Sequence, residues 1–83
     1  MYKNRAENGR NNISGHNIKR LRESLPHKPS QREFSEMLQR EGLDVGKNVI
    51  QEIEAGKRFV TDIDLQVLAK IFGVSYDELL KEE

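Results

Sequence analysis

The sequence predicts an all-α domain of five short helices. Three observations favour this fold class: apolar residues recur at spacings of three and four, helix-capping residues precede most of these runs, and glycine or proline follows them. No segment has the pattern of a strand, and no internal repeat is present. With 83 residues, the chain can form one hydrophobic core but not two.

The N-terminal residues differ in composition from the rest of the chain. Residues 1–13 are mainly asparagine, glycine, lysine and arginine, with almost nothing apolar. Such a segment buries too little surface to offset the entropy lost on ordering, so we expect a flexible tail. The apolar spacing begins at Ser14, and we therefore expect a single domain over residues 14–83.

Two prolines separate the first two helices. The first helix is expected to have about three turns, with Ile18, Leu21 and Leu25 on its apolar side. Pro26 and Pro29 then bracket a short loop, because proline removes a backbone donor and ends a helix.

A capping box begins the second helix. Ser30 and Glu33 have the spacing at which each side chain can satisfy the other residue's backbone amide. Gly42 is expected to end this helix, and residues 43–46 form a turn with apolar anchors. The buried stripe of the second helix comprises Phe34, Met37 and Leu38.

The third and fourth helices are bounded by similar signals. The third is expected over residues 47–55, with Gly56 in the position of a left-handed cap. Thr61 is expected to cap the fourth helix, and Gly73 ends it. The apolar positions of the two helices are Ile50, Ile53, Ile63, Leu65, Leu68, Ala69 and Phe72.

The charges are unevenly distributed although the formal net charge is zero. Residues 1–29 contain seven basic and two acidic residues, residues 30–58 contain five and six, and residues 59–83 contain two and six. One end of the chain could therefore face a polyanion, whereas the other could not. Chance clustering of solvated charges is an alternative explanation.

Several functional classes are disfavoured by composition. The absence of cysteine excludes disulfides, thiolate zinc sites and cysteine nucleophiles. His16 and His27 lack metal-ligand spacing, so we expect no metal or other cofactor. Since no nucleophile or cofactor loop is evident, we do not expect an enzyme. We expect no membrane span, because no run approaches about 20 apolar residues, and no secretory signal, because no apolar stretch follows the basic N-terminal residues; a cytoplasmic location fits this expectation.

Polar residues form the outward face of the third predicted helix. These are Lys47, Asn48, Gln51 and Glu52. Lysine can donate to guanine, asparagine and glutamine can pair with adenine, and glutamate can accept from cytosine. Lys47 and Asn48 also lie at the helix start, the end that enters the major groove in a helix-turn-helix. Plain solvation of an outer helix face is the alternative interpretation.

Four stretches together resemble a known family. They are IKRLR at 18–22, SQREFS at 30–35, VIQEIEAGKR at 49–58 and LAKIFGVS at 68–75. Through them, residues 17–80 resemble the Cro/C1-type helix-turn-helix family, also called the XRE family, which includes phage repressors. The resemblance implies a five-helix, lambda-repressor-like fold, sequence-specific binding to duplex DNA and a repressor-like role in transcription.

The resemblance also implies residue roles. Bases or the adjoining backbone would be contacted by Lys47, Asn48, Gln51 and Glu52. Phosphates would be contacted by Gln31, Lys57 and Arg58. A partly buried ion pair between Arg22 and Glu54 would join the first helix to the third.

The sequence departs from the family pattern in two places. Residues 39–43 make the link between the second and third helices longer than usual, which predicts a longer second helix and a larger turn. Gly46 stands at the cap of the third helix, where the family often has serine or threonine; glycine caps nearly as well but offers no hydroxyl to a phosphate.

A short fifth helix is the predicted site of assembly. Ser75 and Glu78 match a second capping box, and Leu79 should point inward. Tyr76 and Leu80 lie four residues apart and form a stripe that could cover a homodimer interface or complete the core of the monomer. A protein-interaction module, such as an antitoxin or an adaptor with its own protein partner, is the alternative to a DNA-binding regulator.

Overall fold

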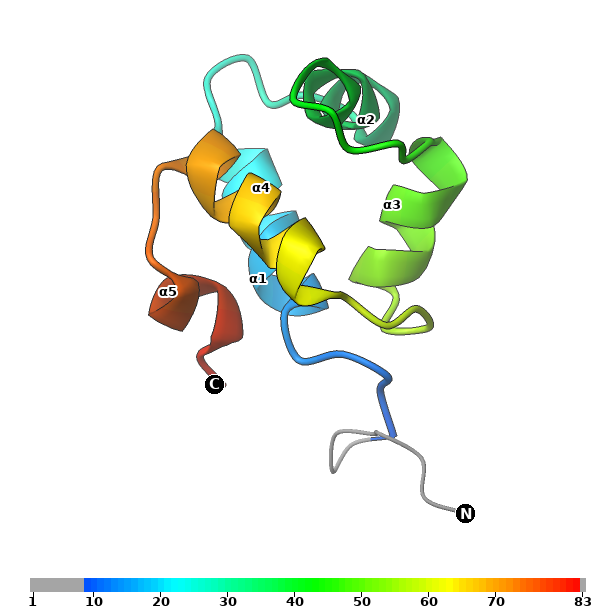
Figure 1. Cartoon of the computed structure of the whole chain (residues 1–83), viewed down its shortest axis with the longest axis vertical. Coiled ribbons are helices and arrows are strands. Elements are labelled where there is room, and N and C mark those ends of the chain that lie inside the picture. The colour runs from blue at the N-terminus through cyan, green and yellow to red at the C-terminus, as the bar shows by residue number, and fades with distance from the viewer. Residues whose placement is uncertain (1–8, 83) are drawn as a thin grey trace.

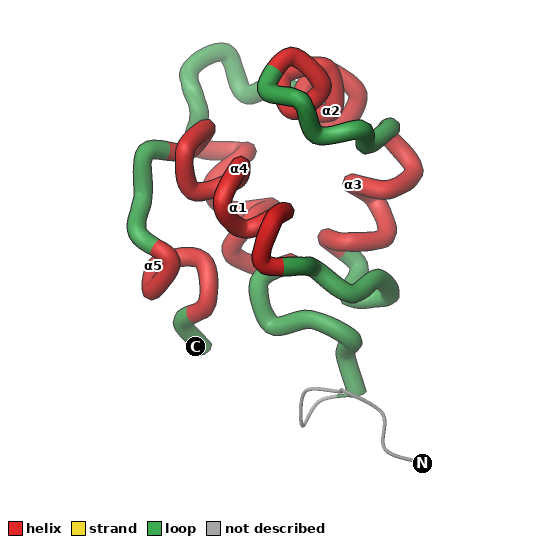
Figure 2. The backbone as a smooth tube through the Cα atoms, in the orientation of Figure 1, coloured by secondary structure: helices red, strands yellow, loops and turns green. Residues whose placement is uncertain are grey.

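The computed structural model describes residues 9–82, which contain five α-helices and no strand (Figure 1). The predicted all-α class is confirmed. Long loops join the first four helices, and a shorter one leads into the fifth (Figure 2). The helices are α1 (Gly15–Ser24), α2 (Gln31–Arg40), α3 (Lys47–Glu54), α4 (Asp62–Phe72) and α5 (Tyr76–Leu80).

One hydrophobic core joins all five helices, because each contributes at least one side chain that is almost fully buried. Between α2 and α4, the rings of Phe34 and Phe72 stack with centroids 5.2 Å apart and planes inclined by 13°. The buried apolar residues are Ile18, Phe34, Leu38, Val45, Ile50, Ile53, Leu68 and Leu79.

Helix α1 is central to the packing. It contacts α3, α4 and α5, while α2 packs against α3 and α4. Helices α3 and α5 consequently lie on opposite sides of α1 (Figure 1). This arrangement leaves the outer face of α3 uncovered by the other helices.

Side chains were predicted to cap three helices, at Ser30, Thr61 and Ser75. The structure agrees fully at the first two positions and in part at the third. The Ser30 hydroxyl accepts from the Glu33 amide, and the Ser30 amide donates to the Glu33 carboxylate, which lowers the pKa of Glu33. Thr61 begins α4 with the same reciprocal bonds. At Ser75 only one bond of the box forms, in which the Glu78 amide donates to the Ser75 hydroxyl. The Glu78 carboxylate pairs with Lys81 and Arg20 instead of accepting from the Ser75 amide.

The link between α2 and α3 has an ordered conformation. Gly42 has a φ of +90°, which favours glycine, and the Leu43 amide donates back to the Leu38 carbonyl over 3.0 Å. The Gln39 side chain donates to the carbonyl of Val45 over 2.7 Å, and Val45 itself is buried. The residues that lengthen this link therefore form an anchored turn rather than a loose loop.

The structure differs from the flexible tail predicted for residues 1–13. Residues 1–8 lie outside the described residues, but residues 10–12 hydrogen-bond to the C-terminal end of α3 and the following loop. The prediction was wrong for these three residues because it considered only apolar burial. Their polar side chains are instead satisfied by backbone carbonyls.

One apolar face lacks a covering element among the described residues. Ile63, one of the apolar positions of the predicted fourth helix, is 64% exposed. It precedes Leu68 by five residues, which places it on another side of α4. Tyr76 and Leu80 are also exposed whereas Leu79 is buried, so the Tyr76–Leu80 stripe does not complete the core.

Candidate nucleic-acid interface

A buried ion pair holds α3 to α1. The Arg22 Nε atom lies 2.7 Å from Glu54 Oε2, and a second guanidinium nitrogen donates to Glu54 Oε1 over 3.0 Å. The pair is thus bidentate, and both side chains are buried. The hydrogen bond with Glu54 raises the pKa of Arg22 above its ordinary value, so the guanidinium stays protonated. The predicted pair is therefore present.

The same pair also organises the chain between α1 and α2. A further nitrogen of Arg22 donates to the Pro29 carbonyl over 3.0 Å. Gln31, at the start of α2, donates to Glu54 Oε1 over 3.0 Å. Gln31 was expected to contact a phosphate, and in the free protein its amide nitrogen is bound to Glu54. Its position relative to α3 is thereby determined by the ion pair.

The outward face of α3 is exposed along its length. Ile50 and Ile53 are buried on the inner side, because they lie three residues apart and on one face of the helix. The N-cap residue is Gly46, so no side chain caps the first turn of α3. The predicted base-reading residues are brought together on the exposed side; they are Lys47, Asn48, Gln51 and Glu52.

Lys57 and Arg58 follow α3 in a sharply turned loop. Gly56 has a φ of +78°, and the Lys57 amide donates back to the Glu52 carbonyl over 2.9 Å. This cap reverses the chain, so that Lys57 and Arg58 lie beside the last turn of α3 with both side chains exposed. The two predicted phosphate-binding residues therefore flank the predicted base-reading face.

Glu52 and Arg58 form an exposed ion pair across this loop. The Arg58 Nη1 atom lies 3.3 Å from Glu52 Oε1, and about half of each side chain remains exposed. Because exposed pairs are weak, Arg58 can exchange this carboxylate for another anion. Glu52, a predicted base-reading residue, is thus paired with Arg58, a predicted phosphate-binding residue. The sequence analysis did not predict this ion pair.

Sequence reasoning missed three polar residues that support this surface. Arg10, Asn11 and Asn12 bind the backbone at the end of α3. The available signal was the capping preference of asparagine: the Asn12 side chain accepts from the Gly15 amide at the first turn of α1 over 2.9 Å. In an asparagine-rich segment, that signal was outweighed by the expectation of disorder.

The chemistry of the assembled surface suits the binding of a polar, anionic partner, because exposed hydrogen-bonding side chains lie beside the exposed cations of Lys57 and Arg58. Within residues 9–82, no cluster of three or more histidine, cysteine or acidic residues could hold a metal ion. No helix in this part of the chain is long and apolar enough to cross a membrane.

This fold and surface define a helix-turn-helix domain, in which α2 and α3 form the motif and α3 presents the exposed face. A family model described as helix-turn-helix matches residues 18–79, about three quarters of the chain. The chain therefore belongs to the XRE-type helix-turn-helix family, a family of DNA-binding domains. Searches of curated proteins and of solved structures found no significant match.

The ion pair yields a prediction about stability. Replacing Glu54 with alanine leaves the Arg22 guanidinium buried without its carboxylate, and we expect a loss of roughly 3–5 kcal/mol in the free energy of unfolding. That is a large share of the stability of a small domain. Chemical denaturation measures the loss.

Glu52→Ala is the matched control, because it removes the same side chain from an exposed position of the same helix. We expect it to change the free energy of unfolding by less than about 0.5 kcal/mol. Equal stabilities of the two variants would contradict the structural role of the buried pair.

Proposed function

We propose that this chain is a sequence-specific DNA-binding regulator of transcription, with a repressor-like role, that inserts α3 into the major groove. The observation that carries the proposal is the geometry of α3. Its inner face is packed on the core, while its outer face carries four exposed hydrogen-bonding side chains beside two exposed cations. In a helix-turn-helix complex, the second helix reads base edges and the flanking residues hold phosphates.

The proposed division of roles follows the arrangement of the residues. Lys47 and Asn48 lie at the start of α3, the end that penetrates the groove most deeply in this motif. Gln51 and Glu52, one turn further on, contact base edges or the adjoining backbone. Lys57 and Arg58 contact the phosphates at the groove edge, and Gln31 contacts a phosphate from the start of α2 while it remains bound to Glu54.

We further propose that the chain acts by binding alone, without a cofactor and without catalysis. Duplex DNA is its principal partner, and the cytoplasm is the compartment in which it would meet that partner. A net charge of zero does not oppose this role, because phosphate binding depends on the local cations rather than on the total.

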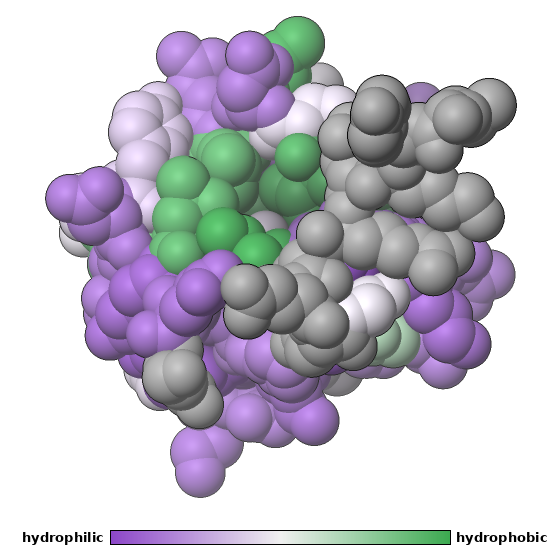
Figure 3. Space-filling model, turned by 90° about the horizontal axis from the view of Figure 1, so that it is seen from below, coloured by the Kyte–Doolittle hydropathy of each residue, from purple (hydrophilic) through white to green (hydrophobic). Residues whose placement is uncertain are grey.

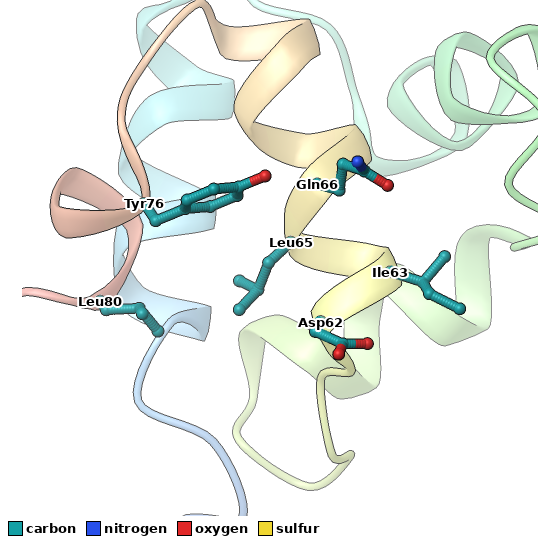
Figure 4. Close-up of a pocket in the computed structure, with 6 residues that line it drawn as sticks. All are labelled: Asp62, Ile63, Leu65, Gln66, Tyr76 and Leu80. Atoms are coloured by element: carbon teal, nitrogen blue, oxygen red, sulfur yellow. The ribbon is translucent and has the colours of Figure 1, made fainter.

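A second copy of the chain is the proposed occupant of the α4–α5 face. Figure 4 shows Tyr76, Leu65 and Leu80 around a groove between these helices, and Figure 3 shows apolar surface gathered in one patch. One α3 helix spans few base pairs, so a pair of copies related by a two-fold axis would double the recognised sequence. Helix α5 lies on the other side of α1 from α3 (Figure 1), so pairing through α5 would leave both α3 helices free.

The alternative function is a protein-interaction module, such as an antitoxin or an adaptor. The exposed apolar face of α4 and α5 favours it, since such a face can equally receive a different protein. The two functions differ in their dependence on salt. A phosphate-binding protein loses DNA affinity steeply as salt rises, whereas an adaptor has almost no DNA affinity at any salt concentration. A duplex-binding isotherm at two salt concentrations therefore separates them.

The proposed insertion of α3 into the major groove of DNA predicts the effect of substitutions at the start of α3. Because the side chains of Lys47 and Asn48 are exposed, Lys47→Ala and Asn48→Ala should leave the fold intact. Each should weaken binding to a duplex selected from a random pool by about 1–3 kcal/mol and relax the preference at one base pair. If both variants bind the selected duplex as tightly as the parent, α3 does not read the groove.

The Glu52–Arg58 pair predicts a gain in binding. Glu52→Gln removes a negative charge from the proposed interface and releases Arg58, so non-specific duplex affinity should rise by about 1 kcal/mol, or roughly fivefold. Asp77→Asn makes the same charge change on α5, away from α3, and should have little effect. Equal gains for both variants would indicate a general charge effect and would contradict the proposed role of Arg58.

The assembly proposal predicts the stoichiometry on DNA. Two copies should bind one duplex that carries two half-sites about 34 Å apart, as sedimentation can measure. Leu80→Glu places a charge in the α4–α5 groove and should abolish the two-to-one complex while leaving binding to a single half-site unchanged. A strictly one-to-one complex of the parent protein in excess would contradict the homodimer.

A further inference from the structure

Residues 10–12 run across the C-terminal end of α3 and form what we call the N-terminal strap. The Asn11 backbone amide donates to the Gly56 carbonyl over 2.8 Å, and its side chain donates to the Lys57 carbonyl over 2.9 Å. Arg10 donates to the Glu54 carbonyl over 2.9 Å. The strap thus binds three carbonyls, those of Glu54, Gly56 and Lys57, at the point where α3 ends and the basic loop begins.

Asn12 is the central residue of the strap. Its side-chain nitrogen donates to two carbonyls, that of Ile53 over 3.0 Å and that of Arg58 over 2.7 Å. Its side-chain oxygen accepts from the Gly15 amide at the start of α1. A single buried amide therefore joins α1, the last turn of α3 and the loop that follows, and both of its polar atoms are hydrogen-bonded.

Two glycines allow this close approach. A Cβ atom at Gly15 would collide with the Ile53 carbonyl oxygen, so the start of α1 sits directly against the end of α3. A Cβ atom at Gly56 would lie 2.5 Å from the guanidinium carbon of Arg10, so the Arg10 side chain lies flat on the loop. A larger residue at Gly15 would force the start of α1 away from the end of α3, and a larger residue at Gly56 would displace the Arg10 side chain.

The strap holds the backbone of the two basic residues that are proposed to bind phosphates, Lys57 and Arg58. The carbonyl of Lys57 is bound by Asn11 and that of Arg58 by Asn12, while the Lys57 amide is bound within the cap of α3. The side chains of Lys57 and Arg58 nevertheless remain exposed. Fixing the backbone while leaving the cations in solvent reduces the conformational entropy that each would lose on binding a phosphate.

We propose that the N-terminal strap is a positioning element of the DNA-binding surface, and that Asn12 is its principal positioning residue. It orients the loop of Lys57 and Arg58 relative to α3, so that phosphate contacts and groove contacts form together. This inference rests on the proposed DNA-binding function and extends it to residues that precede the matched helix-turn-helix region.

The chain contains a matched control for Asn12. Asn17 is also a buried asparagine, and its side-chain nitrogen also donates to two carbonyls, those of Leu79 and Lys81, each over 2.8 Å. It ties α1 to the end of α5, whereas Asn12 ties α1 to the end of α3. Asn12→Ala and Asn17→Ala therefore remove the same kind of interaction on opposite sides of α1, and only the α3 side carries the proposed DNA-contacting residues. The comparison uses a duplex with a single half-site, so that the proposed pairing face on α4 and α5 does not contribute.

The test measures duplex affinity against salt for the full chain and both variants, at a temperature where each is folded. Asn12→Ala should lose at least tenfold in affinity, and its slope of log affinity against log salt should fall by about 0.9 for each phosphate that the variant no longer binds. Asn17→Ala should keep the parent slope and lose no more than about twofold. Equal losses and equal slopes in the two variants would overturn the role of the strap.

Two further measurements separate the positioning role from a general loss of folding: a milder substitution, and Asn12→Ala in a background that lacks the two cations. Asn11→Ala removes only an exposed bond to the Lys57 carbonyl, so it should fold and show a smaller fall in slope. In a Lys57→Gln, Arg58→Gln background, Asn12→Ala should have little further effect on the slope, because the cations that it positions are already absent. An unchanged slope for Asn11→Ala, or full additivity in the background, would overturn the proposal.

The outcomes also separate this inference from the function on which it rests. If the parent protein shows no salt-dependent duplex binding, the DNA-binding function itself fails. If the parent binds with a steep salt slope while Asn12→Ala and Asn17→Ala behave alike, only the positioning role of the strap fails.

Discussion

The buried pair of Arg22 and Glu54 is the constraint on which the rest of the molecule depends. Two opposite charges inside so small a core are stable only if each remains hydrogen-bonded, and here the carboxylate binds Arg22 twice and Gln31 once. The guanidinium also binds the Pro29 carbonyl. One interaction thus joins α1, the loop after it, the start of α2 and the end of α3. The angle at which α3 leaves the core follows from those contacts.

The two ends of α3 are held very differently, and the difference suits a binding helix. Its C-terminal end is bound by the ion pair at Glu54, by the glycine cap at Gly56 and by the side chain of Asn12. Its first turn has no side-chain cap, and Lys47 and Asn48 are exposed there. The rigid end provides the reference position, and the open end keeps its amides and side chains available for a ligand.

The distribution of charge in space explains how a chain of zero net charge can meet a polyanion. Lys57 and Arg58 lie together at the end of α3, and the strap adds Arg10 to the same end. Several acidic residues lie in α4 and α5, on or near the apolar face that no other described element covers. Glu52 pairs with Arg58 on the basic side. In the proposed function this pair would limit attraction to any duplex, so that base contacts would contribute more to recognition.

Local signals in the sequence determined the helices, because capping and apolar spacing act over a few residues. Ser30, Thr61 and Gly56 have the predicted roles, and the outward position of Lys47 and Asn48 follows from the burial of Ile50 and Ile53. Apart from the pair of Arg22 with Glu54, which the family resemblance implied, the contacts between distant segments were decided by the tertiary structure alone. The strap was predicted to be disordered because the partners of Asn12 lie more than 40 residues away in the sequence, as backbone carbonyls that no side-chain pattern reveals. The exposure of Tyr76 and the pairing of Glu52 with Arg58 were likewise undetermined, since each depends on how the chain packs or turns around it rather than on local spacing.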